Sequence, residues 1–421
     1  MKYSAPRGTK DILPEESRLW QFVESTSREI FELYNYKEIR TPIFESTELF
    51  SRSIGSTTDI VKKEMYTFPD RKGRSLTLRP EETAPVVRAG IENNLISPDQ
   101  ITKLYYVGPM FRYERPQAGR QRQFHQAGVE VYGSSDPQLD AEVIQMSVKL
   151  FEKLGLKDLE VDINSVGDKN CQPAYREAIQ KYFKENIKHM CEDCKQRFEQ
   201  NPLRILDCKE AHCQQYIEKA PAAVDHLCPE CKEHFERVIR WLDGLMIRYR
   251  VNDRLVRGLD YYTRTAFEVV SKQLGAQNAV CGGGRYDDLV EQLGGKSTPA
   301  IGFAIGLERV IEILKQLRVT YYALRVTDLF IASLGDKAKE VGFKLLAEVR
   351  AKGISADMDY QGKSLKAQMK AADRMKAKYV YIIGDNEIEK RSAILKNMRT
   401  AEQKEVAFDK LVETIRAVEE K

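Results

Sequence analysis

Residues 111–130 constrain the fold of this chain more than any other stretch of its sequence. Side chains of different character alternate with a two-residue period on both sides of a loop built around Pro116 and Gly119, which is the pattern of a β-hairpin. Arg112 and Glu114 share one face of the first strand. The matching face of the second strand carries Phe124, Gln126, Gly128 and Glu130. A sheet that collects these side chains on one face can form the floor of a polar pocket.

The loop of this hairpin is basic, since it contains Arg115, Arg120 and Arg122. Guanidinium groups bind phosphates through paired hydrogen bonds, so the loop suits an anionic ligand. Gly128 would let such a ligand approach the backbone of the sheet. The pattern leaves one alternative open, which is a basic surface hairpin whose charges are solvated.

At 421 residues the chain is long enough for roughly two or three domains that each bury a core. Its 67 Lys and Arg against 63 Asp and Glu leave a net charge of +4, which excludes a histone-like polycation. No run of about 18 apolar residues could cross a membrane, and the first residues do not form a secretory signal. We therefore expect a cytoplasmic protein without a membrane segment.

Strand patterns outnumber connecting helices in much of the chain. The predicted strands are 36–45, which Pro42 interrupts, 74–79, 104–114, 124–132, 158–163, 255–270 and 300–306. One predicted helix follows Pro14, and two others cover 137–154 and 307–317. The glycines at 282–284 predict a tight turn at 282–285. These elements favour an α+β fold, a mostly antiparallel sheet with flanking helices.

Changes in composition divide the chain further. Residues 167–245 are charged, rich in cysteine and expected to be helical, so they interrupt a first domain made of residues 1–166 and 246–324. From 325 to 421 the pattern predicts a separate doubly wound α/β domain, with strands at 329–333 and 379–383 and helices at 337–352 and 365–375.

The second helix of this α/β domain has a basic face. The residues that fall close together on it are Lys363, Lys366, Lys370 and Arg374. Such a run is either an electrostatic footprint for a polyanion such as RNA or an ordinary solvated face.

The cysteines crowd into one region, because seven of the eight lie between Cys171 and Cys231. In a reducing compartment such crowding indicates metal ligation more than disulfides. The two C-x-x-C pairs predict a tetrathiolate zinc site made of Cys191, Cys194, Cys228 and Cys231. Competing ligands are Cys208, His212 and Cys213, and the remaining alternative is a set of free thiols.

Several segments together resemble the signature motifs of class II aminoacyl-tRNA synthetases. The segment around Pro42 resembles motif 1, the dimer element, residues 111–114 resemble motif 2, and residues 302–309, which end in Gly-Leu-Glu-Arg, resemble motif 3. Within this class, Arg-Gly-Leu-Asp-Tyr-Tyr-Thr-Arg-Thr at 257–265 is similar to a motif of histidyl-tRNA synthetases. Residues 77–84 resemble the amino-acid-binding loop of that family, and residues 283–287 agree with it.

The resemblance implies the fold and the activity of that family. The expected fold is a class II synthetase-type antiparallel sheet with flanking helices, a helical cysteine-rich insertion and a C-terminal α/β anticodon-binding domain. The expected reaction is the ATP-dependent ligation of L-histidine to tRNA(His) through a histidyl-adenylate, by a homodimer that uses Mg2+ on the β- and γ-phosphates; Zn2+ would belong to the insertion alone.

By resemblance, site residues can be assigned one by one. Arg112 and Arg257 would be catalytic, because both would contact the α-phosphate. The expected ATP-binding residues are Arg112, Glu114, Arg120, Phe124 and Arg309. The expected histidine-binding residues are Glu81, Thr83, Arg112, Gln126, Glu130, Arg257, Tyr261 and Tyr262, with Glu130 and Tyr262 on the imidazole ring and Glu81 and Thr83 on the amine.

One position departs from the family pattern, because Glu82 stands where the loop commonly has glycine. A carboxylate there is expected either to point outward or to lie near the substrate amine. The rival interpretation keeps the fold without the activity, as a histidine-binding regulatory paralogue. Such relatives tend to lose the ATP arginines and the C-terminal domain, both of which this sequence has. A generic RNA-binding module would explain the basic helix but not the pocket.

Overall fold

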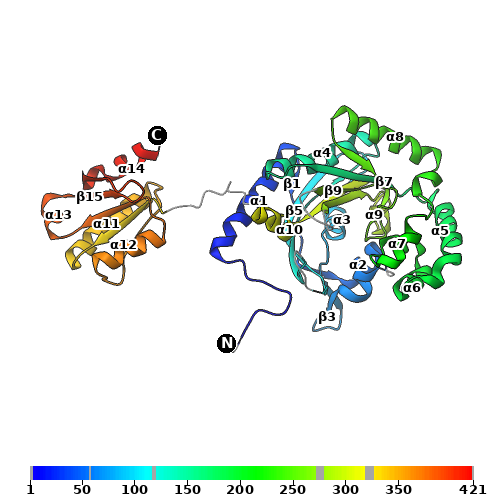
Figure 1. The fold of residues 1–421 in the computed structure, drawn as a ribbon, viewed down its shortest axis with the longest axis horizontal. Coiled ribbons are helices and arrows are strands. Elements are labelled where there is room, and N and C mark those ends of the chain that lie inside the picture. The colour runs from blue at the N-terminus through cyan, green and yellow to red at the C-terminus, as the bar shows by residue number, and fades with distance from the viewer. Residues whose placement is uncertain (1–2, 56–57, 116–119, 272–278, 318–326, 420–421) are drawn as a thin grey trace. The chain divides into compact units, whose positions relative to one another are not determined.

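The computed structural model describes residues 3–55, 58–115, 120–271, 279–317 and 327–419 (Figure 1). Pro116 and Gly119 of the predicted hairpin loop lie outside the described residues, and so does the predicted domain boundary at 324–325. The chain forms two compact units, residues 1–319 and residues 320–421, each of which is described by itself.

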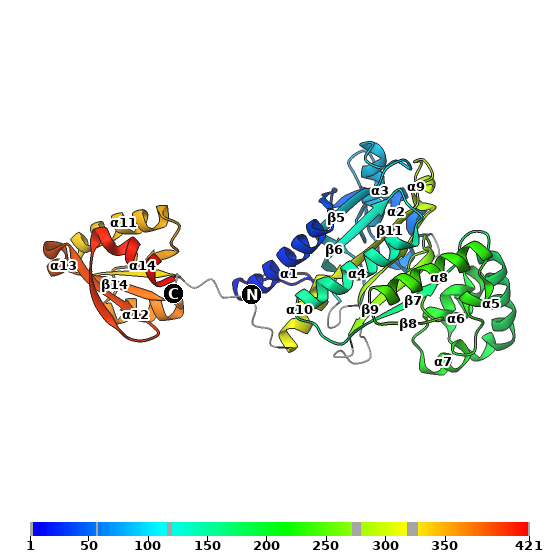
Figure 2. The ribbon, with the colours of Figure 1, turned by 90° about the horizontal axis from the view of Figure 1, so that it is seen from above.

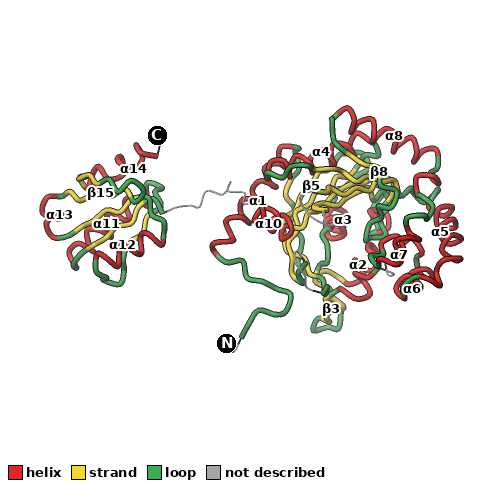
Figure 3. Tube along the Cα trace, in the orientation of Figure 1, coloured by secondary structure: helices red, strands yellow, loops and turns green. Residues whose placement is uncertain are grey.

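The first unit is built on a sheet of eight strands (Figure 3). Their order across the sheet is β1 (Lys37–Glu38), β5 (Thr102–Phe111), β6 (Gln123–Tyr132), β11 (Ala300–Gly306), β10 (Ala279–Arg285), β9 (Thr263–Ser271), β7 (Leu159–Ser165) and β8 (Tyr249–Val251). Neighbours from β5 to β7 are antiparallel, and within this described sheet only the pairings of β1 with β5 and of β8 with β7 are parallel. The predicted mostly antiparallel sheet is therefore confirmed.

Long helices pack along one face of this sheet (Figure 2). They are α1 (Pro14–Leu33), α4 (Pro137–Lys153), α8 (Pro229–Gly244) and α10 (Leu307–Gln316). Phe31 of α1 contacts Tyr105 of β5 and Phe303 of β11, with ring centroids 5.4 and 6.0 Å apart. A proline in the first turn begins α4, and Asp136 caps it by accepting a hydrogen bond from the amide of Gln138 at 2.8 Å.

Shorter elements lie on the opposite face. They are α2 (Thr47–Ile54), the single π-helical turn at Ile60–Glu64, α3 (Thr83–Glu92), α9 (Leu289–Gln292) and a small sheet in the order β2 (Phe44–Ser46), β4 (Ser75–Leu78) and β3 (Tyr66–Pro69). The segment 36–45, predicted as one interrupted strand, contributes β1 to the large sheet and β2 to the small one. Pro42 lies between them. Because proline has no amide hydrogen to donate, it interrupts the backbone hydrogen bonding between paired strands.

The cysteine-rich segment is helical, as predicted. It contains α5 (Gln172–Asn186), α6 (Glu192–Gln200), α7 (Ala211–Ile217) and α8, together with short 3-10 turns at Ile187–His189, Pro202–Asp207 and Ala223–His226. Its apolar side chains form a cluster of their own around Ile179, Phe183 and Ile205, all fully buried.

Two local predictions for the sheet are wrong. The glycines at 282–284 do not form a tight turn but belong to strand β10, and the strand predicted from residue 255 begins only at Thr263. Crowding across the sheet explains the glycines. A Cβ on Gly283 would lie 2.3 Å from the carbonyl oxygen of Gly302, and one on Gly282 would lie 2.2 Å from the Arg257 guanidinium.

The second unit has a five-stranded sheet in the order β13 (Ala356–Met358), β12 (Leu329–Ser333), β14 (Tyr379–Ile383), β15 (Ser392–Asn397) and β16 (Gln403–Ala407). Its helices are α11 (Asp336–Ala351), α12 (Leu365–Arg374), α13 (Asp385–Lys390) and α14 (Leu411–Glu419). The predicted strands β12 and β14 are confirmed at both ends. The antiparallel strands β15 and β16 were not predicted, because the outward Ile394 interrupts the alternation in β15 and Val406 is the single buried residue of β16.

Among the described helices of both units, none combines the length and the apolar character that crossing a membrane requires.

Strand β11 offers a matched pair of substitutions that tests this packing. In Gly302→Ala the new methyl group would lie 2.3 Å from the carbonyl oxygen of Val129 and 2.0 Å from the Glu130 carboxyl group, so we expect destabilisation by about 2 kcal/mol or more. Gly306→Ala meets no atom within 4 Å and should change the stability little. Thermal unfolding of both variants measures the difference, and equal midpoints would contradict the packing described.

Candidate active site

Small residues hollow out the centre of the sheet on the face away from α1. Residues that pair across antiparallel strands point to the same side, so two rows can be followed through the sheet. One row runs through Leu104, Glu130, Gly302 and Gly284. The next runs through Tyr106, Gly128, Ala304 and Gly282. Five of these eight positions are glycine or alanine, which leaves space above the sheet for other side chains and for ligands.

Glu130 lies in this hollow and is only 1% exposed. Its Oε1 accepts a hydrogen bond from the hydroxyl group of Thr83 at 2.7 Å, and its Oε2 accepts one from the hydroxyl group of Tyr286. Burial raises the pKa of Glu130 to about 8, against the opposing effect of these two donors. A carboxyl group held in this way can exchange hydrogen bonds with a polar ring that enters the hollow.

The loop before α3 supplies the next polar groups. The Glu81 carboxylate accepts hydrogen bonds from the amides of Thr83 at 2.7 Å and Ala84 at 3.0 Å, so it caps the first turn of α3. Burial raises the pKa of Glu81 above its ordinary value. Thr83, predicted to contact a substrate amine, directs its hydroxyl group to Glu130.

Tyrosines form a wall of the hollow. The rings of Tyr261 and Tyr262 are 4.8 Å apart, and those of Tyr261 and Tyr286 are 5.6 Å apart. Tyr286 was quoted in the sequence only as part of a motif, and its contact with Glu130 depends on strand register rather than on any local signal. The space at Gly128 is not open to a ligand, because a Cβ there would lie 2.4 Å from the hydroxyl oxygen of Tyr106.

Gln126 lies in β6 of the same sheet, opposite Gly108 and Gly306. Its side-chain oxygen Oε1 is buried and accepts no hydrogen bond from any of the described residues. A buried amide oxygen without a donor carries a cost of about 1–3 kcal/mol, which a ligand donor could remove.

A second cavity of about 290 Å³ adjoins this hollow. It is lined by all five residues predicted to bind ATP, which are Arg112, Glu114, Arg120, Phe124 and Arg309. The structure adds Arg257 and Glu268 to the same cavity. Glu268 forms an ion pair with Arg257, and no sequence pattern singled it out. Strand β9 brings it to the cavity by pairing with Gly282 of β10.

The cavity concentrates positive charge. The Nε of Arg112 donates to the carbonyl oxygen of Pro80 at 2.8 Å, and its guanidinium lies 5.2 Å from the centre of the Phe124 ring. Burial lowers the pKa of Arg309, and the nearby charge of Arg120 lowers it further. Four arginines that line a cavity beside a flat aromatic ring suit an anion with an aromatic base.

Arg122 of the hairpin loop does not line this cavity. The guanidinium of Arg122 stacks on Tyr113 at 3.8 Å from the ring centre and donates to the backbone oxygen of Glu114 at 3.4 Å. It therefore stabilises the hairpin.

The expectation that Glu82 points outward is wrong. Its side chain is buried, and its Oε1 accepts hydrogen bonds from Arg79 at 2.8 Å and from the hydroxyl group of Thr41 at 2.7 Å, while its Oε2 has no partner among the described residues. A position near the substrate amine stays a prediction. Arg79 also donates to the carbonyl oxygens of Thr41 at 3.0 Å and Pro109 at 2.9 Å. The pair thus joins the segment of Pro42 to strand β5. The positive charge of Arg79 thus balances the carboxylate of Glu82, which stands where the family pattern commonly has glycine.

The predicted tetrathiolate is also wrong in its composition. Cys191 and Cys194 lie with Cys208 and Cys213, whereas Cys228 and Cys231 lie with Asp168 and Cys171. The two cysteines of each C-x-x-C pair therefore lie together, but the fold places the two pairs in different groups. His212 is exposed and belongs to neither group.

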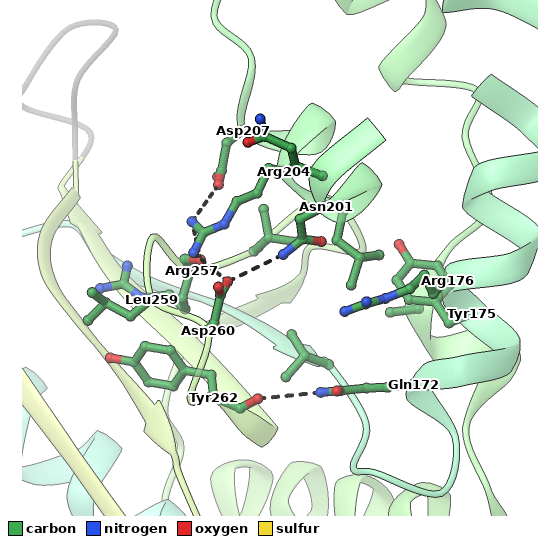
Figure 4. A pocket seen from close by; sticks show the side chains of 15 residues that line it. Gln172, Tyr175, Arg176, Asn201, Arg204, Asp207, Arg257, Leu259, Asp260 and Tyr262 are labelled. Atoms are coloured by element: carbon green, nitrogen blue, oxygen red, sulfur yellow. Dashed lines mark hydrogen bonds and ion pairs between the residues drawn. The ribbon is translucent and has the colours of Figure 1, made fainter. Parts of the chain in front are cut away.

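A third cavity, of about 240 Å³, lies between the segment 256–262 and the cysteine-rich helices (Figure 4). Arg204 crosses it, donating to Asp260 at 2.7 Å and to the backbone oxygen of Arg257 at 3.2 Å. The Nε2 of Gln172 lies 3.5 Å from the backbone oxygen of Tyr262. These contacts attach the helical segment to the loop that carries three of the predicted site residues, Arg257, Tyr261 and Tyr262.

Comparison with known proteins gives a consistent result over the whole chain. Residues 8–310 match the family model of histidyl-tRNA synthetase, and residues 328–418 match that of an anticodon-binding domain. A histidine–tRNA ligase of Halothermothrix orenii is 53% identical over 98% of this chain and 99% of its own. One from Desulforamulus reducens is 51% identical over 99% and 100%. The crystal structure of apo histidyl-tRNA synthetase from S. aureus has a TM-score of 0.84 and 44% identity, over 98% of this chain and all of that one.

The buried pair of Arg79 and Glu82 gives a stability prediction. Glu82→Ala would leave the Arg79 guanidinium buried without its counter-ion, so we expect a loss of about 3 kcal/mol or more in the free energy of unfolding. Glu48→Ala removes an exposed ion pair with Arg52 and should have little effect. Denaturant unfolding of the two variants provides the measurement, and a mild effect of Glu82→Ala would show that the pair is not essential.

Glu130 gives a prediction about pH. Its pKa in the folded state is about 8, above the ordinary value of 4.5. Between pH 4.5 and pH 8 the Glu130 carboxyl group is therefore protonated in the folded protein but ionised in the unfolded chain. This contribution is fully present below pH 4.5 and is lost as the pH rises toward 8. Relative to Glu130→Gln, the wild type should lose up to about 1.4 kcal/mol of stability per pH unit in this window. Unfolding midpoints of both proteins at several pH values measure it, and a constant difference would contradict the raised pKa.

Proposed function

The chain belongs to the histidyl-tRNA synthetase family, and we propose on this premise that it ligates L-histidine to tRNA(His) at the expense of ATP. The observation that carries the proposal is the pairing of two sites on one sheet face, the hollow around Glu130 and the arginine-lined cavity beside it. The first has the groups to hold a polar amino-acid side chain, and the second has those to hold a nucleoside triphosphate.

In the first step the histidine carboxylate attacks the α-phosphorus of ATP, a bond forms between them, and pyrophosphate leaves. Arg112 and Arg257 line the same cavity, so both can contact the oxygens of the α-phosphate, where negative charge accumulates. Their guanidinium groups also orient the attacking carboxylate, which reduces the entropic part of the barrier. In the second step the terminal ribose hydroxyl of the tRNA attacks the carbonyl carbon of the adenylate and releases AMP.

Histidine recognition belongs to the hollow. Glu130 and Tyr262 are assigned to the two imidazole nitrogens, Glu81 and Thr83 to the amine, and Gln126 to the carboxylate end. Tyr261 shapes the wall between them. We add Tyr286, which fixes Glu130 by its hydroxyl group. A site with buried hydrogen-bonding groups rejects ligands that lack the matching partners by about 10⁴-fold or more, which removes the need for editing.

ATP recognition belongs to the second cavity. Phe124 stacks on adenine, Glu114 accepts from its amino group, and Arg309 and Arg120 hold the outer phosphates. The carboxylates that line this cavity are those of Glu114 and Glu268, and Mg2+ prefers oxygen ligands, so Glu268 together with the phosphates would hold that ion. When bound, Mg2+ neutralises charge on the β- and γ-phosphates.

Domain roles follow the family. Residues 1–166 and 246–324 form the catalytic domain, 167–245 the insertion and 325–421 the anticodon-binding domain. Helix α12, with Lys366, Lys370 and Arg374, is assigned to the tRNA backbone because its cations can displace counter-ions from phosphates. The protein works in the cytoplasm.

We assign a homodimer through the segment around Pro42. Ile43 and Phe44 are 44% and 51% exposed, and Phe68 of the neighbouring strand is 40% exposed. The rings of Phe44 and Phe68 lie 6.5 Å apart, so these side chains form one apolar patch that a second copy would cover. Sedimentation velocity of Phe44→Lys should show a monomer, and an unchanged dimer would place the interface elsewhere.

The regulatory-paralogue alternative is not favoured. Relatives that are about half identical over the full chain are histidine–tRNA ligases, and the cavity retains its arginines.

Amino-acid-dependent exchange of pyrophosphate into ATP tests the function. Histidine alone among the twenty amino acids should support exchange, and aminoacylation should follow with tRNA(His). Exchange with another amino acid, or none at all, would overturn the proposal.

Arg257 allows a sharper test of the mechanism. Arg257→Lys keeps the charge but loses the planar donors, so we expect kcat for pyrophosphate exchange to fall by about 100-fold. Arg250→Lys is the matched control, because this exposed arginine pairs with the buried Asp162 and does not line the cavity, so kcat should be unchanged. A mild effect of Arg257→Lys would assign the α-phosphate to other groups.

A further inference from the structure

The described residues of the cysteine-rich segment contain two clusters that could each hold a metal ion. Their members are Cys191, Cys194, Cys208 and Cys213 in the four-cysteine cluster, and Asp168, Cys171, Cys228 and Cys231 in the Asp168 cluster. In each cluster one ligand atom of every member lies within 4.8 Å of the others. We propose that the chain binds two zinc ions, one by four thiolates and one by three thiolates and a carboxylate.

The sulfur spacing fits ions rather than disulfides. All eight cysteines are free, and the Sγ atoms of Cys191 and Cys208 lie 3.7 Å apart. A disulfide needs about 2.05 Å. Four sulfurs at about 2.3 Å from one tetrahedral zinc ion are separated by about 3.8 Å. The separation of Cys191 and Cys208 is therefore that of two sulfurs on one zinc ion, and the other ligand atoms of the cluster lie within 4.8 Å of one another.

The two C-x-x-C turns have the same backbone conformation. Cys191 precedes α6 with φ −67° and ψ 163°, and Cys228 precedes α8 with φ −66° and ψ 160°. The second cysteine of each pair, Cys194 or Cys231, follows in the first turn and is fully buried. The amino end of a helix favours negative charge, so both turns place their sulfurs where thiolates bound to a cation would be stabilised.

Backbone amides also point at the sulfurs. The amide of Cys191 donates to Cys213 Sγ at 3.3 Å, and the amide of Asp168 donates to Cys171 Sγ at 3.2 Å. Such hydrogen bonds orient metal-bound sulfur and reduce its charge. Each cluster therefore has supporting contacts as well as its four ligands.

Each ion would join elements that come from different parts of the cysteine-rich segment. The four-cysteine cluster connects α6 and α7, of nine and seven residues, through Cys208 at the end of the 3-10 turn Pro202–Asp207. Helices this short are marginal alone, and a metal ion contributes folding energy directly. The Asp168 cluster connects the chain just after β7 to the start of α8.

Both ions would also position the histidine site. The turn that ends at Cys208 carries Arg204, which binds Asp260 and the backbone of Arg257 (Figure 4). From the other side, Asp168 lies 3.8 Å from the Arg264 guanidinium, and Gln172, next to Cys171, contacts the backbone of Tyr262. The segment 257–264 is thus held at both ends by residues next to the clusters. This consequence rests on the proposed function, whereas metal binding does not.

Metal analysis of the full chain, purified without chelators from medium with added Zn2+, tests the proposal. We expect two zinc ions per chain. Cys208→Ser and Cys171→Ser should each reduce this to one, because each removes a ligand of a different cluster. His212→Ala, an exposed histidine within the segment, is the matched control and should retain two. One ion or none in the wild type, or two in either cysteine variant, would overturn the proposal.

X-ray absorption at the zinc edge of the wild type covers the case in which a variant fails to fold. The two clusters together provide seven sulfur ligands and one oxygen ligand per two ions. A shell dominated by nitrogen or oxygen would contradict the assignment. As a further readout, removal of zinc from the wild type with a chelator should raise KM for histidine several-fold more than KM for ATP. Two bound ions without any exchange activity would refute the proposed function and leave the metal sites intact.

Discussion

A carboxyl group buried in the middle of a sheet is the constraint on which the rest of the site depends. Glu130 is almost fully buried, and its position requires hydrogen-bond donors on both oxygens and free space on both neighbouring strands. Thr83 from the start of α3 and Tyr286 from the end of β10 supply the donors. Gly302 supplies the space, since any larger residue would collide with the carboxyl group. Three separate segments of the chain are therefore fixed relative to one another by one side chain.

The same sheet face separates two kinds of recognition. Near Glu130 the groups are uncharged hydroxyls and carboxyls with raised pKa values, whereas toward Phe124 the groups are arginines. Arg257 lies at the boundary, where its charge is balanced by Glu268 and its approach is allowed by Gly282. A molecule with a cationic or neutral polar end and an anion next to it matches this order of charges. Histidine beside the triphosphate of ATP has that arrangement.

Assignments within 81–83 and 257–262 came only from resemblance to the histidyl-tRNA synthetase family. Sequence patterns predicted most of the elements and the polar face of the hairpin at 111–130, because alternation along a strand is a local feature. They failed where the decisive contact is distant in sequence. Gly282 and Gly283 were assigned to a turn because their crowding against Arg257 and Gly302 arises only across strands. Tyr286 and Glu268 acquire their contacts by register, and Glu82 by its pairing with Arg79. Spacing of cysteines identified ligands but could not show that the fold sorts them into two clusters.

Histidine affinity in Glu130→Gln, compared with ATP affinity in the same variant, tests the central claim most directly. Isothermal titration of the full chain would provide both values. Glutamine has the size of glutamate but replaces one carboxyl oxygen by an NH2 group, which cannot accept a hydrogen bond, so the account predicts that histidine binds about 100-fold more weakly while the affinity for ATP is unchanged. Unchanged histidine binding, or an equal loss for both ligands, would contradict the assignment of Glu130 as the group that recognises the imidazole ring.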